Sequence, residues 1–179
     1  MTITILPLTG IEINEKKIKL GMSKEDIVSA LGEAETIYEN LPDAQDKVHL
    51  YYFESELRFD LNNENKLEFI ELLGGAEGKL RPEIYGVPAF LAKADELLRL
   101  LTEKNNGDIT DDEDGYSYAF PNIGIGIYRE SVPEDIEEML RDAEEQGEPL
   151  SEEEYNHELS LAEHWATIGI GGKDCYSAF

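Results

Sequence analysis

The chain has 179 residues, of which 40 are Asp or Glu and 15 are Lys or Arg, so its net charge is −25. This charge argues against binding to a nucleic-acid backbone or an anionic membrane, because both need clustered Lys and Arg. Hydrophobic residues still make up 41% of the chain and aromatic residues 9%, which excludes a disordered acidic tail and predicts a folded protein.

A single cysteine, Cys175, excludes an internal disulfide. The first residues, MTITILP, alternate like a short strand and lack the charged-then-apolar pattern of a secretion signal. No apolar run approaches the roughly 20 residues that a membrane-spanning helix needs. We therefore expect residues 1–179 to form a single compact domain in the cytoplasm.

Isoleucines alternate with polar residues over positions 3–20, which predicts short N-terminal strands. Ser23 and Asp26 have the spacing of a capping box, so a helix is expected from Ser23 to Gly32. The following alternating runs predict strands at 36–39, 49–53, 57–61 and 67–72. The asparagine-rich residues 62–65 predict a hairpin between the last two of them.

Residues 74–87 contain four glycines and read as a linker. Beyond them, apolar residues at helical spacing predict a helix from Pro88 to the stop at 105–107, and alternation predicts strands at 116–120 and 123–127. A helix followed by a β hairpin thus occurs twice. The pattern favours an α+β fold, with helices packed on a mostly antiparallel sheet. It leaves open two similar halves, 1–73 and 88–179.

Residues 130–163 hold 14 acidic residues and one base, Arg141. Capping boxes at Ser131–Glu134 and Ser151–Glu154 predict two helices with narrow apolar stripes, followed by a strand at 166–171. Their acidic outer faces are either solvated surfaces that keep the protein soluble or a docking surface for a basic protein. The candidate partner-binding residues there and in the acidic loop before them are Glu134, Asp135, Glu137, Glu138, Asp142, Glu144, Glu145, Asp111, Asp112 and Asp114.

Nothing in the sequence predicts a catalytic residue, a metal site or a cofactor. The hairpin from Asp60 to Glu71 places acids or amides at several calcium-loop positions, but Asn65 replaces the turn glycine and the flanks read as strands. A catalytic metal usually takes three protein ligands, and the histidines offer no evident set of three. A nucleophilic cysteine needs a histidine beside it, and nothing close to Cys175 in the sequence supplies one.

Isoleucine and glycine alternate in residues 123–127 and again in residues 168–172. Glycine in a strand often marks the close approach of another element. We therefore expect either a helix lying tightly on the glycine face or pairing between these two strands.

The segment LGMSKEDIVSALG at 20–32, followed by strands, resembles the opening of helix-plus-sheet modules of the β-lactamase-inhibitor protein family, which implies a protein-binding and non-catalytic role. The size, the acidity and the segment GYSYAFPNIGIGIYR at 115–129 resemble the small acidic immunity proteins of bacterial toxin systems.

The first hypothesis is therefore an immunity-type inhibitor of a basic toxin or nuclease. The second hypothesis is a regulatory or scaffold module, either monomeric or homodimeric. Such a module would bind through a sheet edge or exposed aromatic residues, and its acidity would serve solubility. The third is an uncharacterised enzyme that acts on a small molecule or depends on a metal.

Overall fold

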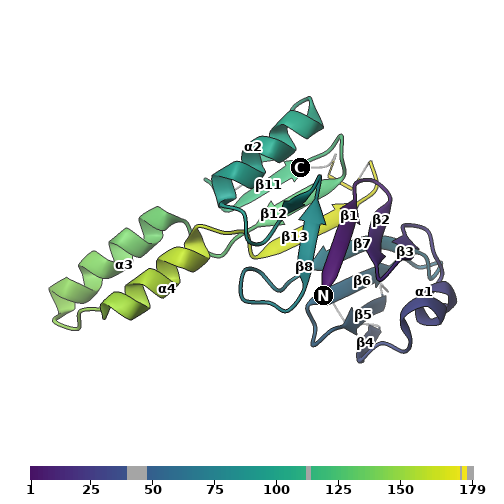
Figure 1. Ribbon diagram of the computed structural model, residues 1–179, viewed down its shortest axis with the longest axis horizontal. Helices are drawn as coiled ribbons and strands as arrows, with labels where there is room; N and C mark the ends of the chain where they lie inside the picture. The colour runs from purple at the N-terminus through teal and green to yellow at the C-terminus, as the bar shows by residue number, and fades with distance from the viewer. Residues whose placement is uncertain (40–47, 112–113, 174, 177–179) are drawn as a thin grey trace.

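A computed structural model of the protein describes residues 1–39, 48–111, 114–173 and 175–176. Within these residues the strands form two sheets that lie one in front of the other, with β1, β2 and β8 in front of β7 and β13 (Figure 1). The strand order is β3-β2-β1-β8-β9 in the small sheet and β10-β11-β12-β13-β7-β6-β5-β4 in the large sheet. The predicted α+β fold with mostly antiparallel pairing is confirmed.

The bounds of the elements follow the alternation and the caps of the sequence. The small sheet contains β1 (Thr2–Leu6), β2 (Gly10–Ile13), β3 (Lys16–Lys19), β8 (Arg81–Ile84) and β9 (Val87–Pro88). The large sheet contains β4 (Thr36–Glu39), β5 (Val48–Tyr52), β6 (Leu57–Leu61), β7 (Leu67–Leu72), β10 (Thr110–Asp111), β11 (Ser117–Phe120), β12 (Ile125–Tyr128) and β13 (Thr167–Gly171). The helices are α1 (Lys24–Leu31), α2 (Ala94–Asn105), α3 (Pro133–Gln146) and α4 (Glu152–Ala162).

The core lies on one face of the large sheet, which we call its inner face. Leu50, Phe59 and Ile70 are direct neighbours across β5, β6 and β7, and the row continues through Ile170 of β13 and Ile125 of β12. These side chains are buried in one cluster with the isoleucines of the small sheet and the apolar side of α2. Because side chains alternate along a strand, the residues between them point to the opposite, outer face.

The two halves of the large sheet have the same order of elements. Helix α1 precedes the antiparallel strands β4 to β7, and α2 precedes β10 to β13. The last strands of the two series, β7 and β13, pair antiparallel at the centre. The helix-then-strands repeat that the sequence indicated is therefore present, with four strands after each helix.

The boundaries predicted around the glycine-rich stretch are wrong. The stretch 74–87, interpreted as a linker, contains β8 and the first residue of β9, and β8 pairs parallel with β1. The helix expected from Pro88 begins at Ala94, because Pro88 lies in β9 opposite Glu83. The predicted end is correct: Asn106 adopts the left-handed conformation, with φ 48°, that terminates α2.

Helices α3 and α4 form an antiparallel hairpin, inserted between the paired strands β12 and β13, that projects away from the sheets (Figure 1). We call residues 130–163 the arm. The helices of the arm pack on each other, whereas α1 and α2 pack on the sheets. No helix in the described part of the chain is long and apolar enough to cross a membrane.

Candidate functional site

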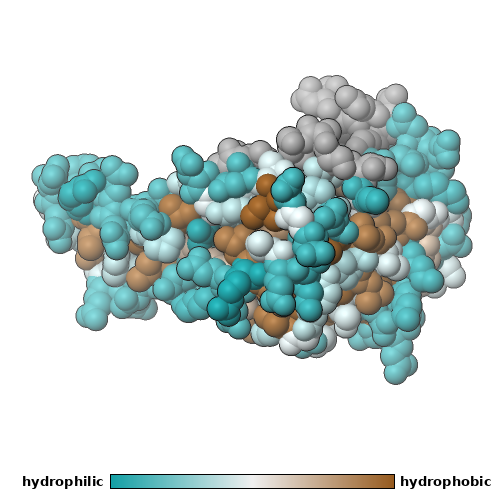
Figure 2. Space-filling view, turned by 90° about the horizontal axis from the view of Figure 1, so that it is seen from above, coloured by the Kyte–Doolittle hydropathy of each residue, from teal (hydrophilic) through white to brown (hydrophobic). Residues whose placement is uncertain are grey.

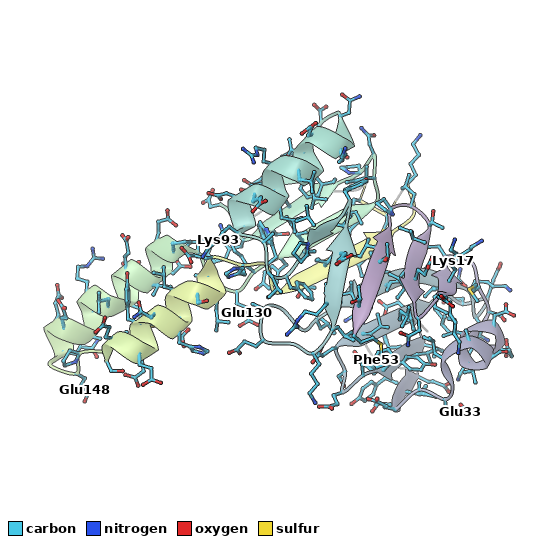
Figure 3. All side chains as sticks on the ribbon, viewed as in Figure 1. Lys17, Glu33, Phe53, Lys93, Glu130 and Glu148 are labelled. Atoms are coloured by element: carbon cyan, nitrogen blue, oxygen red, sulfur yellow. The ribbon has the colours of Figure 1, made fainter. Side chains whose placement is uncertain are left out.

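The arm is a charged projection with a small apolar base. Ile136 and Ala162 are buried there, whereas Met139 is already 36% exposed one turn further along α3. Glu130 lies near the base and Glu148 at the far end (Figure 3). The far end is hydrophilic over most of the visible face (Figure 2). The arm therefore presents its acids to solvent on several sides.

Most of the predicted partner-binding acids are on this projection and exposed. They are Glu134, Glu137, Glu138, Asp142, Glu144 and Glu145. Glu138 lies 3.3 Å from the guanidinium of Arg141, and both side chains are well exposed. An exposed pair of this kind contributes about 0–1 kcal/mol to stability. With 14 acidic residues and one base in 130–163, the field of the arm stays strongly negative.

Asp135 has a different role. Its Oδ2 accepts hydrogen bonds from the Tyr116 hydroxyl at 2.6 Å and from the Val132 amide at 2.9 Å. These two bonds, the Tyr116 bond first, lower the pKa of the Asp135 carboxyl. The predicted Ser131–Glu134 capping box is therefore wrong by one residue, because α3 begins after Val132 and Asp135 supplies the capping carboxylate. Asp135 holds the start of the arm.

The acidic loop before β11 lies beside the arm base. Asp111 and Asp114 are exposed, whereas Asp112 lies outside the described residues. Both Asp114 and Asp135 raise the pKa of Tyr116 electrostatically, after the larger effects of the Asp135 hydrogen bond and burial. The loop and the base of the arm thus belong to one acidic surface. The second predicted capping box is confirmed, with the Glu154 carboxylate 2.9 Å from the Ser151 amide.

The base of the arm is fixed by buried and half-buried contacts. Arg129 donates from Nε to the carbonyl of Gly115 and from Nη1 to the carbonyl of Ala162, both at 2.9 Å. Its guanidinium lies 5.0 Å from the ring centre of buried Trp165, whose indole donates to the carbonyl of Ala94 at 3.0 Å. Lys93 forms an ion pair with Glu163 at the same junction (Figure 3). The arm therefore has a defined direction relative to the sheets.

A second concentration of charge lies on the outer face of the large sheet. The Arg58 guanidinium donates to both Asp60 oxygens, at 2.9 and 3.1 Å, and its Nη1 lies 2.8 Å from Glu71 Oε2. His49 Nδ1 lies 2.6 Å from Asp60 Oδ1. We call these four residues the outer-face cluster. Their side chains are only 9–26% exposed, so the cluster is half-buried.

Next to this cluster, strands β12 and β13 have glycines on the outer face. Gly126 and Gly169 face each other across β12 and β13, which confirms the predicted pairing of the two glycine-alternating strands. The element that approaches the glycines is the ring of Tyr176 and not a helix. Tyr176 also makes an edge-on contact with Phe69, with ring centres 6.3 Å apart. A pocket of about 200 Å³ opens beside these residues.

In the described part of the chain, Cys175 and His49 lie on the same face of the large sheet but are not neighbours. Cys175 lies against Gly171, which is three strand spacings, about 14 Å, from His49. The described residues hold no group of three metal-binding side chains. The Asp60–Glu71 hairpin does not resemble a calcium loop, since Asp60 is bound to Arg58 and the Asn62 side chain accepts from the turn amides.

Comparisons with known proteins give little further guidance. No protein-family model matches the chain, and a search of curated proteins finds no match. A crystal structure of an extracellular protein containing an SCP domain from Bacillus anthracis str. Ames is similar at 12% sequence identity with a TM-score of 0.39. The match covers 90% of this chain and 50% of that chain, so this chain spans about half of its length. A likeness at this level supports no functional argument.

Proposed function

We propose that the protein is a non-catalytic, immunity-type inhibitor that binds and neutralises a basic toxin or nuclease through the arm. The segregation of charge carries this proposal, since 14 acidic residues and one base fall within 130–163. A protein that needed acidity only for solubility would gain as much from acids spread evenly over its surface. The proposal places the protein in the cytoplasm, where a chain with a single cysteine needs no internal disulfide.

The placement of these acids supports docking to a basic surface. Clustered charge of one sign attracts a partner of opposite charge over about a Debye length, roughly 8 Å at physiological salt, and speeds association. Because the contacts of Arg129 and Trp165 fix the base, the acids of α3 are held in a defined direction. A rigid surface loses little conformational entropy when it binds.

The test is capture of a partner from the lysate of the source cell with two matched variants. The arm variant replaces five exposed acids of α3 by lysine: Glu137, Glu138, Asp142, Glu144 and Glu145. The control variant replaces five exposed acids elsewhere by lysine: Glu15, Glu33, Glu64, Glu83 and Glu103. Each variant raises the net charge by ten, so the two differ only in where the charge changes.

We expect the wild type and the control variant to retain one stoichiometric basic protein at low salt. The affinity of the arm variant for that protein should be at least 100-fold lower. Equal loss in both variants would mean that net charge alone decides. Full retention by the arm variant would place the binding surface elsewhere. A concentration-dependent mass in light scattering, with no captured protein, would favour the homodimeric module of the second hypothesis.

A further inference from the structure

The two helices of the arm meet along an apolar seam that is separate from the core. The seam residues recur at helical spacing and are Ile136, Leu140, Ala143, Tyr155, Leu159 and Ala162. Only Ile136 and Ala162, at the base, are buried, and the other four are half-buried. Within the described residues, the core cluster includes no side chain of the arm. The seam is therefore half open to solvent over most of its length.

One face of the arm is apolar down to its base. Met139 and Leu161 lie on the same side of the seam, because each precedes a seam residue by one position and the two helices are antiparallel. Met139 is 36% exposed and Leu161 is half-buried. Leu161 lines a hollow of about 220 Å³ whose walls also include Leu73 and Trp165. Apolar patches interrupt the hydrophilic surface along the arm (Figure 2). This face is therefore an apolar strip that ends in a hollow.

Acidic residues border this strip. Glu130 lies at the base of the arm (Figure 3) and lines the hollow together with Glu77 and Glu158. Arg129 lines it as well, but its N–H groups donate to backbone carbonyls at the base. Further along the arm, the exposed acids of α3 continue the border. A complementary ligand is therefore apolar along its centre and positively charged at its sides.

We propose that the arm binds a basic amphipathic helix of the partner protein along this strip. This inference deepens the proposed function and rests on it for the partner being a basic toxin or nuclease. A helix packs into the groove between two neighbouring helices, and an amphipathic helix presents apolar side chains at positions i, i+3, i+4 and i+7. These side chains cover Met139 and Leu161, and the first of them enters the hollow. Lys and Arg on the flanks of the helix then face the bordering acids.

Other occupants fit the strip less well. A second copy of the arm would bring another 14 acidic residues and one base against the first, and like charges at this density repel. An extended strand would need free backbone groups to pair with, and the backbone groups within a helix are already bonded to each other. The charge and the helical shape together favour a basic helix.

The experiment titrates the full-length protein with three synthetic peptides of about 18 residues, which is five helical turns. The patterned peptide has leucines at the amphipathic spacing and lysines elsewhere. The scrambled peptide has the same composition without an apolar face, and the acidic peptide has glutamate in place of each lysine. Calorimetry measures affinity, and the fluorescence of Trp165, the single tryptophan, reports on the hollow.

We expect the patterned peptide to bind with a dissociation constant on the order of 10 μM at low salt and to change the Trp165 fluorescence. The scrambled peptide carries the same charge and therefore controls for diffuse attraction to an acidic protein. It should bind at least tenfold more weakly, and the acidic peptide should show no binding.

Three variants that keep the net charge make the test specific. Met139→Gln and Leu161→Gln should each weaken binding of the patterned peptide about fivefold, because each withdraws one apolar side chain from the interface. Leu91→Gln changes a side chain that is 48% exposed outside the arm, and it should leave the affinity unchanged. If Leu161→Gln does not fold, Met139→Gln carries the test, since its side chain is exposed.

The proposal is overturned by equal binding of the patterned and scrambled peptides, by the absence of saturable binding, or by unchanged affinity in Met139→Gln. Selective peptide binding without capture of a partner would refute the inhibitor role and keep the helix site. Capture of a partner that both arm acids and Met139→Gln leave distinguishable, lost in the arm variant but retained in Met139→Gln, would refute the helix site alone.

Discussion

Replacement of Arg58 by methionine tests the outer-face cluster most directly. The change keeps an unbranched side chain but removes the guanidinium that binds Asp60 and Glu71, whose side chains are 9% and 18% exposed. Breaking a buried ion pair from one side costs about 3–5 kcal/mol, because the remaining charge stays desolvated. Arg58 is itself 26% exposed, so some water can reach the carboxylates and the lower end of that range applies.

We therefore expect Arg58→Met to lose about 3 kcal/mol of unfolding free energy at pH 7. For a chain of this size, each kcal/mol corresponds to roughly 2–4 °C in Tm, so the midpoint should fall by about 6–12 °C. The control is Arg99→Met on α2, where the guanidinium is exposed and no loss above about 0.5 kcal/mol is expected.

The pH dependence of this loss has a definite sign. Burial raises the pKa of Glu71 above its ordinary value, and Arg58 opposes that rise. In smaller effects, the charge of Asp60 raises this pKa and His49 lowers it. Without Arg58 the pKa of Glu71 rises more. A carboxyl with a raised pKa in the folded state destabilises the fold when it is charged, and this cost disappears as the pH falls through that pKa.

The stability difference between wild type and Arg58→Met should therefore be largest at pH 7 and shrink toward pH 5. Urea denaturation at both pH values, followed by circular dichroism, measures it. A loss below about 1 kcal/mol at pH 7, or an equal loss at both pH values, would refute the view that Arg58 neutralises half-buried carboxylates.

Two further changes test the arm and the close contact of Tyr176 with the glycines of β12 and β13. Ser151→Ala should remove about 1 kcal/mol of local stability from α4 and speed amide exchange there, while the global midpoint stays within about 1 °C because the arm lies outside the core. Gly169→Val should cost about 1–3 kcal/mol in urea denaturation, since the new side chain would collide with Tyr176 and Phe69. Gly172→Val, where an added Cβ meets nothing within 4 Å, should have little effect beyond its local backbone preference.

The features that the sequence predicted correctly depend on neighbours along the chain. The capping carboxylate of Asp26 is three residues from Ser23, and the same spacing joins Ser151 to Glu154. The strands from β5 to β7 follow one another as antiparallel hairpins, so alternation alone assigns their faces.

The features that the sequence did not reveal depend on contacts between distant segments. Strand β8 has only four residues and is paired with β1, almost 80 positions earlier, so its glycine-rich surroundings hid it. Alternation could have placed Arg58 and Asp60 on one face. Glu71 lies beside Arg58 only because of the register between β6 and β7. That register shifts between Asp60 and Leu61. The site was missed because charged residues are so abundant that no single pair stood out.

The acids of the arm would act on a basic partner mainly before the two proteins touch. Charges on exposed helices act across solvent and are screened by salt, so they mainly increase the association rate. An inhibitor that relied on the arm would therefore meet its target quickly at low salt, and its binding would slow as the salt concentration rises.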